Sequence, residues 1–224
     1  MINHSLSLVH LVRAPRDAGA SKPPLLLLLH GIGSNEQDLF SMSPVLDPRF
    51  FVVSARAPIQ TMEGGYAWFN IEFAADGEIV PDLHQADASR LLLVQFVDDI
   101  IEAYGVDPRC VYLMGFSQGA MMSLSVALTR PEKVAAVVAM SGRLPEQALL
   151  NHGSADDIRE IEIFVSHGTF DDLLPVEDAR SCREELEKLS VPLTYREYPM
   201  GHEVRPEALR EISAWLTSTL DKRG

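Results

Sequence analysis

Residues 111–131 of the chain read VYLMGFSQGAMMSLSVALTRP, and this stretch decides the fold. A run of apolar residues leads into Gly-Phe-Ser-Gln-Gly, and a segment of helical length follows directly. In so tight a strand-to-helix turn the central residue takes a positive φ, which costs a residue other than glycine about 1–3 kcal/mol. Gly115 and Gly119 stand two residues before and after Ser117, where larger side chains would collide. We therefore expect Ser117 to lie above the end of a strand, at the N-terminus of a helix.

Apolar runs of strand length alternate with segments of helical length along the rest of the chain. Most of these runs are continuously hydrophobic, which is typical of strands covered on both faces in a parallel sheet. The predicted strands span residues 24–31, 51–58, 111–116, 134–142, 161–168 and 193–199. They predict an α/β protein with a doubly wound, mostly parallel central sheet and helices on both faces. Residues 1–224 are expected to form a single domain without a large cap.

Helical patterns fill the segments between these strands, at residues 82–105, 118–131, 175–189 and 205–220. The third of them is amphipathic with acidic residues near its start, which suits the helix dipole. Residues 5–12 alternate between polar and apolar, and this pattern favours an antiparallel edge strand. Residues 144–160 are polar, and we expect them to be irregular.

The chain is acidic, with a formal net charge of −13 and a pI of about 4.9. Lysine and arginine form no basic run, so nucleic acid is not expected as a partner. The run of leucines at 25–29 is too short to span a bilayer, and the opening residues lack a signal-peptide pattern. We therefore expect a cytoplasmic protein without membrane insertion, and the sequence leaves a homodimer open. Cys110 and Cys182 indicate free thiols, and no metal or organic cofactor is implied.

A serine hydroxyl is a poor nucleophile near neutral pH unless a base, normally a histidine oriented by a carboxylate, accepts its proton. In folds of this class the acid and then the histidine follow the serine along the chain. Asp171 and Asp172 follow a predicted strand, and by position alone either can be the acid. His202 follows the last predicted strand, and we expect it to be the base. The alternative interpretation is that these aspartates and His202 are ordinary residues of surface loops. His30 and His167 each precede a glycine, and we predict that both are buried residues at strand ends.

Acyl transfer also requires donors for the negatively charged oxygen of the tetrahedral intermediate. Losing one such donor typically costs about 2.7–4 kcal/mol of transition-state stabilisation. The backbone N–H of Gln118, directly after the serine, is the first candidate. The N–H of Ile32 is the second, because it lies in the loop HGIGSNEQD, where Gly31 and Gly33 allow the backbone to turn. A plain glycine turn is the alternative for this loop.

The chain contains, in this order, the motifs LLHGIGSNEQDL, GGYAWFNI, GFSQGAMMS, SHGTFDDLLPV and GHEV. Together they resemble the α/β-hydrolase family of small carboxylesterases, of the phospholipase/carboxylesterase type related to acyl-protein thioesterases, over about residues 25–216. The resemblance implies this set of roles: Ser117 as nucleophile, Asp171 rather than Asp172 as acid, His202 as base, Ile32 and Gln118 as oxyanion donors, and Trp68 beside the acyl pocket. Two positions depart from the family: Asp172 stands where proline is common, and Ser34 stands where acyl-protein thioesterases commonly have aspartate.

The resemblance implies a serine hydrolase that cleaves carboxylic esters through an acyl-enzyme, with a small-molecule ester as its partner. We interpret the aromatic residues of the segment 64–73, Tyr66, Trp68, Phe69 and Phe73, as an apolar wall for the acyl group, and plain core packing explains them as well. Without a cap the site is expected to favour small or medium acyl chains. Hydrolysis of lysophospholipids or acyl-protein thioesters is the alternative. A non-catalytic ligand-binding protein of the same fold is an alternative from another class.

Overall fold

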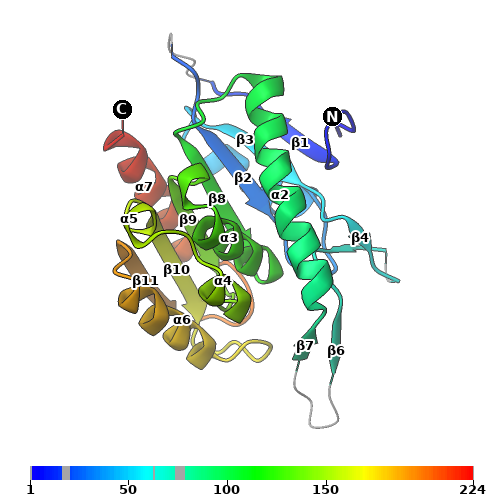
Figure 1. Cartoon of the computed structure of the whole chain (residues 1–224), viewed down its shortest axis with the longest axis vertical. Helices are drawn as coiled ribbons and strands as arrows, with labels where there is room; N and C mark the ends of the chain where they lie inside the picture. The colour runs from blue at the N-terminus through cyan, green and yellow to red at the C-terminus, as the bar shows by residue number, and fades with distance from the viewer. Residues whose placement is uncertain (1, 17–20, 63, 74–78, 224) are drawn as a thin grey trace.

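The computed structural model of the chain describes residues 2–16, 21–62, 64–73 and 79–223. Its main sheet has seven strands in the order β1-β3-β2-β8-β9-β10-β11 (Figure 1). The strands are β1 (His10–Arg13), β2 (Leu25–Leu29), β3 (Phe51–Ala55), β8 (Val111–Phe116), β9 (Ala136–Met140), β10 (Glu162–Gly168) and β11 (Leu193–Tyr198). β1 pairs antiparallel with β3, and the other neighbouring pairs are parallel. The predicted mostly parallel sheet and its antiparallel edge strand are confirmed.

Helices cover both faces of this sheet, as predicted (Figure 1). The longer ones are α2 (Leu83–Tyr104), α3 (Gln118–Thr129), α6 (Val176–Lys188) and α7 (Pro206–Asp221). Their ends follow local chemistry: the Asp82 side chain accepts the N–H of Gln85 at the start of α2, and Gly105 ends that helix with a φ of 67°. α3 ends before Pro131, which cannot continue a helix because it lacks an N–H.

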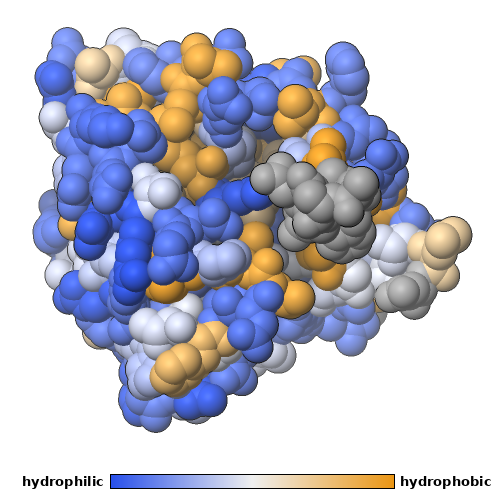
Figure 2. Space-filling model, turned by 90° about the horizontal axis from the view of Figure 1, so that it is seen from below, coloured by the Kyte–Doolittle hydropathy of each residue, from blue (hydrophilic) through white to orange (hydrophobic). Residues whose placement is uncertain are grey.

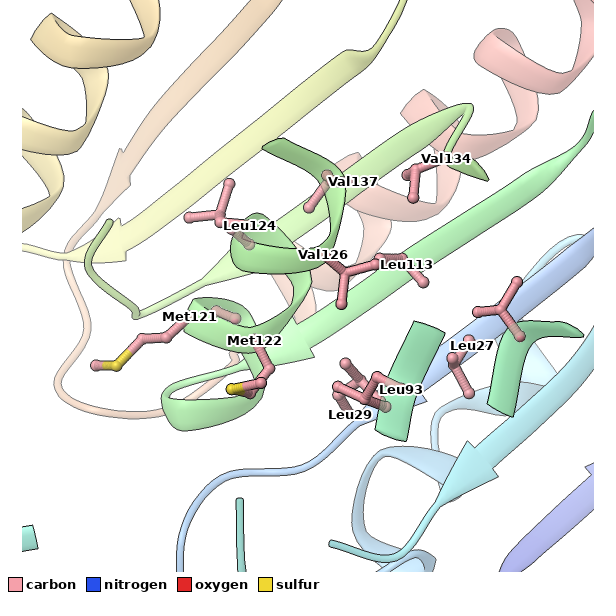
Figure 3. Packing of buried hydrophobic residues seen from close by; sticks show 14 of the residues in the cluster. Leu27, Leu29, Leu93, Leu113, Met121, Met122, Leu124, Val126, Val134 and Val137 are labelled. Carbon is pink, nitrogen blue, oxygen red and sulfur yellow. The ribbon is translucent and has the colours of Figure 1, made fainter. Parts of the chain in front are cut away.

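The five leucines of β2 are all fully buried, which explains why this strand is apolar without alternation. Leu25, Leu27 and Leu29 belong to the cluster that contains residues of α2, α3 and α6. Leu26 and Leu28 belong to the opposite cluster, with residues of α7. Figure 3 shows the first cluster, where side chains of α2 and α3 lie against those of β2 and β8. Each leucine buried in this way contributes about 1.5–3 kcal/mol.

The segment 144–160 differs from its prediction as an irregular stretch, because it forms two short helices, α4 (Glu146–Leu150) and α5 (Ala155–Ile158). Buried side chains anchor them, Ala148 in α4 and Ile158 in α5, and the Ser154 side chain caps α5 by accepting the N–H of Asp157. Each of these short helices has only one buried residue, so its sequence shows no hydrophobic periodicity that would predict a helix.

Between β3 and α2 the chain forms two hairpins that the sequence did not predict. They are β4 (Ile59–Gln60) with β5 (Tyr66–Ala67), and β6 (Ile71–Phe73) with β7 (Ile79–Pro81). Shorter helical segments complete the described part of the chain: α1 (Gln37–Phe40), η1 (Ser43–Val45) and η2 (Pro131–Lys133). Among the described residues, the helices all fall short of the length and apolar character needed to cross a bilayer.

Candidate active site

Ser117 occupies the sharp turn between β8 and α3, as the sequence predicts. Its φ is 52° and its ψ is −118°, a strained conformation for a residue with a side chain. A Cβ atom on Gly115 would collide with the carbonyl oxygen of Gly119, and one on Gly119 would collide with that of Leu29. Both glycines are therefore required for the turn to lie this close to β2, and they leave Ser117 as the N-cap of α3.

The side chain of His202 lies between the serine and an aspartate. Its Nε2 atom is 3.0 Å from the Ser117 hydroxyl oxygen, and its Nδ1 atom is 2.7 Å from Oδ2 of Asp171. With the Nδ1–H donated to the carboxylate, Nε2 is free to accept the serine proton. The ring also packs against Phe116, with 4.9 Å between the ring centroids. The three predicted side chains thus form one chain of hydrogen bonds from three separate loops.

Asp171 is held by more than the histidine. Its carboxylate is buried, and Oδ1 accepts the backbone N–H groups of Leu173 at 3.0 Å and Leu174 at 2.9 Å. These bonds fix the carboxylate so that only Oδ2 faces the His202 ring. Asp172, the other positional candidate, is exposed and makes no hydrogen bond or ion pair with His202 in the described structure. Of the two aspartates, the structure brings Asp171 to the histidine.

A second histidine touches the same carboxylate. His167, predicted only to be a buried strand-end residue, is fully buried as expected, and its Nε2–H donates to the carbonyl oxygen of Leu174 at 2.8 Å. The same Nε2 atom is 3.4 Å from Oδ2 of Asp171. The sequence did not predict this contact, because His167 lies in β10 and Asp171 in the loop after it, where a spacing of four residues does not indicate proximity.

The two predicted oxyanion amides come from the residue after the serine and from a loop that approaches the serine at Gly31. Gln118 is the first residue of α3, so its N–H is one of the unpaired donors at a helix N-terminus. The loop that carries Ile32 approaches closely, since a Cβ atom on Gly31 would lie 3.3 Å from Cβ of Ser117. Among the hydrogen bonds of the described residues, none uses the N–H of Ile32 or of Gln118. Both amides are therefore available to a ligand at Ser117.

The Gln118 side chain has a separate role that the sequence did not reveal. Its Oε1 atom accepts the backbone N–H of Trp68 at 2.7 Å, and its Nε2 donates to the carbonyl oxygen of Phe69 at 2.7 Å. The Trp68 indole N–H in turn donates to the carbonyl oxygen of His30 at 2.9 Å. The first residue of α3 is thus tied to the segment around Trp68, and that segment is tied to the loop of Ile32.

The aromatic residues predicted to contact substrate have different surroundings. Trp68 is fully buried, so its ring packs inside the protein, whereas Phe69 lines a cavity of about 790 Å³. Met121 and Met122 of α3 and Leu144 also line this cavity. β7, α2 and α4 also contribute to its wall, and these elements meet toward the lower end of the molecule in Figure 1. Figure 2 shows the molecule from below, where apolar side chains lie among polar ones. Phe73 belongs to β6, and its side chain lies outside the described part of the structure.

Burial keeps another histidine of the site neutral. The pKa of His30 is lowered by its burial, although a hydrogen bond of 2.7 Å from Nδ1 to the Gly31 carbonyl oxygen opposes this. The Nε2 atom of the neutral ring accepts the N–H of Ala57 at 3.1 Å. His30 is therefore a structural residue at the end of β2. The described residues contain no group of three or more His, Cys, Asp or Glu side chains arranged to hold a metal ion.

The chain is similar to known proteins over most of its length. The model of the phospholipase/carboxylesterase family matches residues 13–220. A probable carboxylesterase SOBER1-like protein of Arabidopsis thaliana is 26% identical over 216 residues, 91% of this chain and 81% of the relative. An acyl-protein thioesterase 1 of Mycosarcoma maydis is 28% identical over 233 residues, 94% of this chain and 96% of the relative.

Solved structures share the fold. Esterase PE8 superposes with a TM-score of 0.80 at 28% identity, covering 96% of this chain and 99% of its own. A carboxylesterase of Bacillus cereus also has a TM-score of 0.80, at 22% identity, covering 95% of this chain and 94% of its own. The sheet, the turn at Ser117 and these matches define an α/β-hydrolase fold, as the sequence predicted. Within that class, the chain belongs to the phospholipase/carboxylesterase family.

Proposed function

We propose that the chain is a serine hydrolase that cleaves carboxylic esters of small or medium acyl chains, with Ser117, His202 and Asp171 as its catalytic residues. The observation that carries the proposal is the continuous hydrogen bonding from Ser117 through His202 to Asp171, at 3.0 and 2.7 Å. The membership of the phospholipase/carboxylesterase family and the carboxylesterase and acyl-protein thioesterase relatives support it.

In the first half of the reaction the Ser117 oxygen attacks the acyl carbonyl carbon. The hydroxyl proton passes to Nε2 of His202, and the imidazolium that forms is stabilised by the Asp171 carboxylate. The carbonyl oxygen becomes negatively charged and accepts the N–H groups of Ile32 and Gln118. When the intermediate collapses, the bond to the leaving oxygen or sulfur breaks, and the leaving group takes the proton from Nε2.

In the second half, water replaces the leaving group. His202 accepts a proton from that water as its oxygen attacks the acyl-enzyme, and a second oxyanion forms at the same two amides. Collapse of this intermediate breaks the bond to the Ser117 oxygen, which takes back the proton from His202. The carboxylic acid leaves and the starting state returns. Each step uses only side chains, backbone amides and water.

The cavity of about 790 Å³ has apolar side chains from α3 in its wall, one helical turn beyond Ser117, and we assign the acyl group to this part of it. Its wall includes Phe69 and Met121, and both residues are tied to the nucleophile: the Phe69 carbonyl binds the Gln118 side chain, and the Met121 N–H donates to the Ser117 carbonyl. The substrate role of Phe69 follows from this position. For Trp68, whose ring is buried, we assign a supporting role through its hydrogen bond to His30.

Thioesters are the second substrate class, because a relative from Mycosarcoma maydis is named an acyl-protein thioesterase. A thiolate is a better leaving group than an alkoxide, so the same machinery can act on both. Matched oxygen and sulfur esters of one acyl chain separate the two: a higher kcat/KM on the oxygen ester identifies a carboxylesterase, and a kcat/KM higher on the thioester by more than its leaving group explains identifies a thioesterase. The expected location in the cytoplasm, the absence of a nucleic-acid partner and the oligomeric state stay predictions.

The proposal is tested with p-nitrophenyl esters of increasing acyl length and the variant Ser117→Ala. We expect hydrolysis to fall by about 10⁴-fold or more in the variant, since the nucleophile is removed. Ser213→Ala is the matched control, because that serine on α7 donates only to the Val45 carbonyl, at 2.9 Å. A folded native chain that neither hydrolyses these esters nor reacts at Ser117 with a fluorophosphonate would instead be a non-catalytic binding protein.

A further inference from the structure

The loop that carries Ile32, here the oxyanion loop (residues 30–36), is held by a neighbouring hairpin. The Gly33 N–H donates to the Tyr66 carbonyl at 2.9 Å, and the Tyr66 N–H donates to the Ser34 carbonyl at 2.8 Å. This pairing fixes the backbone on the far side of Ile32 from the Trp68–His30 bond. Hydrogen bonds at His30 before Ile32, and at Gly33 and Ser34 after it, therefore hold the backbone on both sides of this amide.

Close backbone approach makes this pairing specific. A Cβ atom on Gly65 would collide with the carbonyl oxygen of Gly33, so only glycine lets the hairpin reach the loop. Gly33 itself has a φ of 78°, a conformation that favours glycine. The two glycines set how near the hairpin and the oxyanion loop can lie, and beyond the two backbone hydrogen bonds any further attractive force must come from side chains.

An ion pair supplies that force. Glu36, at the end of the oxyanion loop, is fully buried, and Arg56 binds it in a bidentate manner, with Nε to Oε2 and Nη2 to Oε1 both at 2.6 Å. The third nitrogen of Arg56 donates to the Tyr66 hydroxyl at 3.2 Å, and the guanidinium lies 4.6 Å from the centre of the Tyr66 ring. Arg56 therefore joins the loop, the hairpin and the end of β3 in one contact.

The charge of this pair matters as well as its geometry. A buried carboxylate near an oxyanion hole opposes the negative charge that develops there unless a cation neutralises it. The hydrogen bonds from Arg56 keep the pKa of Glu36 below its ordinary value, so the pair stays charged on both sides. Within the described residues, no other basic side chain lies within 4.0 Å of Glu36.

We propose that Arg56 is a positioning residue for the oxyanion hole: by binding Glu36 and stacking on Tyr66, it fixes the Ile32 amide and neutralises the buried carboxylate. The inference rests on the proposed serine-hydrolase function. It assigns Arg56 an effect on the transition state that a contact serving only fold stability would not have.

The test compares Arg56→Gln, Arg56→Lys and Glu36→Gln with the native chain. Arg49→Gln is the matched control, because Arg49 also binds a carboxylate in a bidentate manner, with Asp47 at 3.0 and 2.7 Å. That pair precedes β3, at the opposite end of the strand from Arg56. For each protein, kcat and KM are measured on one p-nitrophenyl ester at 25 °C, together with the thermal midpoint.

A pair of ketone inhibitors provides a measurement that a change in fold stability alone would leave unchanged. A trifluoromethyl ketone adds the Ser117 oxygen to its carbonyl carbon, passes the serine proton to His202 and leaves an oxyanion in the hole. The methyl ketone of the same chain length binds without forming this adduct. The ratio of the two inhibition constants therefore reports on the oxyanion hole itself.

For Arg56→Gln we expect kcat to fall about 10- to 100-fold with KM nearly unchanged, and the inhibitor ratio to shift by the same factor. Glu36→Gln and Arg56→Lys should show smaller losses, because neither leaves a buried carboxylate without a cation. Arg49→Gln should lower the thermal midpoint and leave kcat and the ratio as they are.

Should the folded Arg56 and Glu36 variants keep the native kcat and inhibitor ratio, the pair serves stability alone and the inference is wrong. Arg56→Lys keeps the test decisive if Arg56→Gln does not fold. Failure of the underlying function is a different result, since the native chain would then neither hydrolyse the ester nor bind the trifluoromethyl ketone more tightly than the methyl ketone.

Discussion

The Nδ1 atom of His202 lies 2.7 Å from Oδ2 of Asp171, while the other oxygen of that carboxylate is occupied by two backbone N–H groups. The carboxylate therefore cannot rotate to offer a different atom without losing both backbone bonds. This fixed orientation selects the tautomer of the neutral histidine ring, because an ionised carboxylate accepts hydrogen bonds and does not donate them. The Nδ1 atom then carries the proton and Nε2 faces Ser117 without one.

Asp171→Asn should lower kcat by about 10⁴-fold with little change in fold. The amide oxygen will take the place of Oδ1, since the N–H groups of Leu173 and Leu174 need an acceptor. The amide NH₂ then faces His202 and forces its proton to Nε2, where it blocks acceptance of the serine proton. Steady-state hydrolysis of a p-nitrophenyl ester and circular dichroism measure the two effects.

Asp172→Asn is the matched control for this variant, because Asp172 is exposed and makes no hydrogen bond or ion pair with His202 in the described structure. We expect its kcat to stay within about twofold of the native value, as for a typical surface substitution. A large loss in Asp172→Asn together with activity in Asp171→Asn would show that the neighbouring aspartate orients the base.

His167→Leu should weaken both stability and activity. The substitution leaves the Leu174 carbonyl without its donor at 2.8 Å, and a buried group left in this state costs about 1–3 kcal/mol. Because Leu174 also donates to Asp171, its displacement loosens the carboxylate. Urea unfolding and kcat measure the two losses.

His167→Gln separates the hydrogen bond from side-chain packing. Its amide nitrogen can take the place of Nε2 and donate to the same carbonyl, so most of the activity should return. Equal losses in His167→Leu and His167→Gln would indicate that the imidazole shape matters and the donor does not.

The sequence predicted the parts of the site that depend on chain order and local backbone. The turn at Ser117 requires Gly115 and Gly119, and both are visible as a motif. The carboxyl ends of parallel strands meet at one edge of the sheet, so the loops that carry Asp171 and His202 had to converge. The chemistry of a serine hydroxyl required a base and an acid, but position alone left Asp171 and Asp172 both open, and only the family resemblance selected Asp171.

The supporting contacts could not be predicted, because they join side chains far apart in sequence without any periodic pattern. Nothing local indicates that Gln118 binds the backbone of Trp68, fifty residues away. A glutamate in a polar loop is normally exposed, yet Glu36 is fully buried and paired with Arg56. Trp68 is predicted to lie beside the acyl pocket, but its indole is fully buried and donates to the His30 carbonyl, and only the structure distinguishes this from an indole that faces a cavity.

Gln118→Met tests the contact between α3 and the Trp68 segment while keeping the Gln118 N–H in place. The Trp68 N–H and the Phe69 carbonyl lose their partners at 2.7 Å, which should destabilise the fold by about 2 kcal/mol or more. Small displacements at an active site are costly, so kcat should fall about tenfold. Urea unfolding and ester hydrolysis measure these effects.

Gln95→Met is the matched control, because this exposed glutamine on α2 donates to Asp99 at 2.8 Å and lies outside the site. It should leave kcat unchanged and alter stability by less than about 0.5 kcal/mol. Native kcat in a folded Gln118→Met variant would show that the side chain serves the fold without ordering the site.

Stability should fall as the pH drops below about 6.5, because burial lowers the pKa of both His10 and His30 from that ordinary value. The unfolded chain then binds protons that the folded chain does not, so the free energy of unfolding decreases with decreasing pH. Well above pH 6.5 both histidines are neutral in either state, and their contribution is complete. The pKa of Asp47 is lowered to about 2, so its contribution is lost only in more acidic solution.

Urea unfolding at pH 7.5, 6.5 and 5.5 measures this dependence, and His10→Gln identifies its source. The glutamine cannot titrate, so the free energy of unfolding should change less between pH 7.5 and 5.5 in this variant than in the native chain. His152→Gln is the control, because that side chain is exposed, and it should keep the native dependence. If His10→Gln and the native chain lose the same free energy over this range, burial of His10 is not a source of the acid sensitivity.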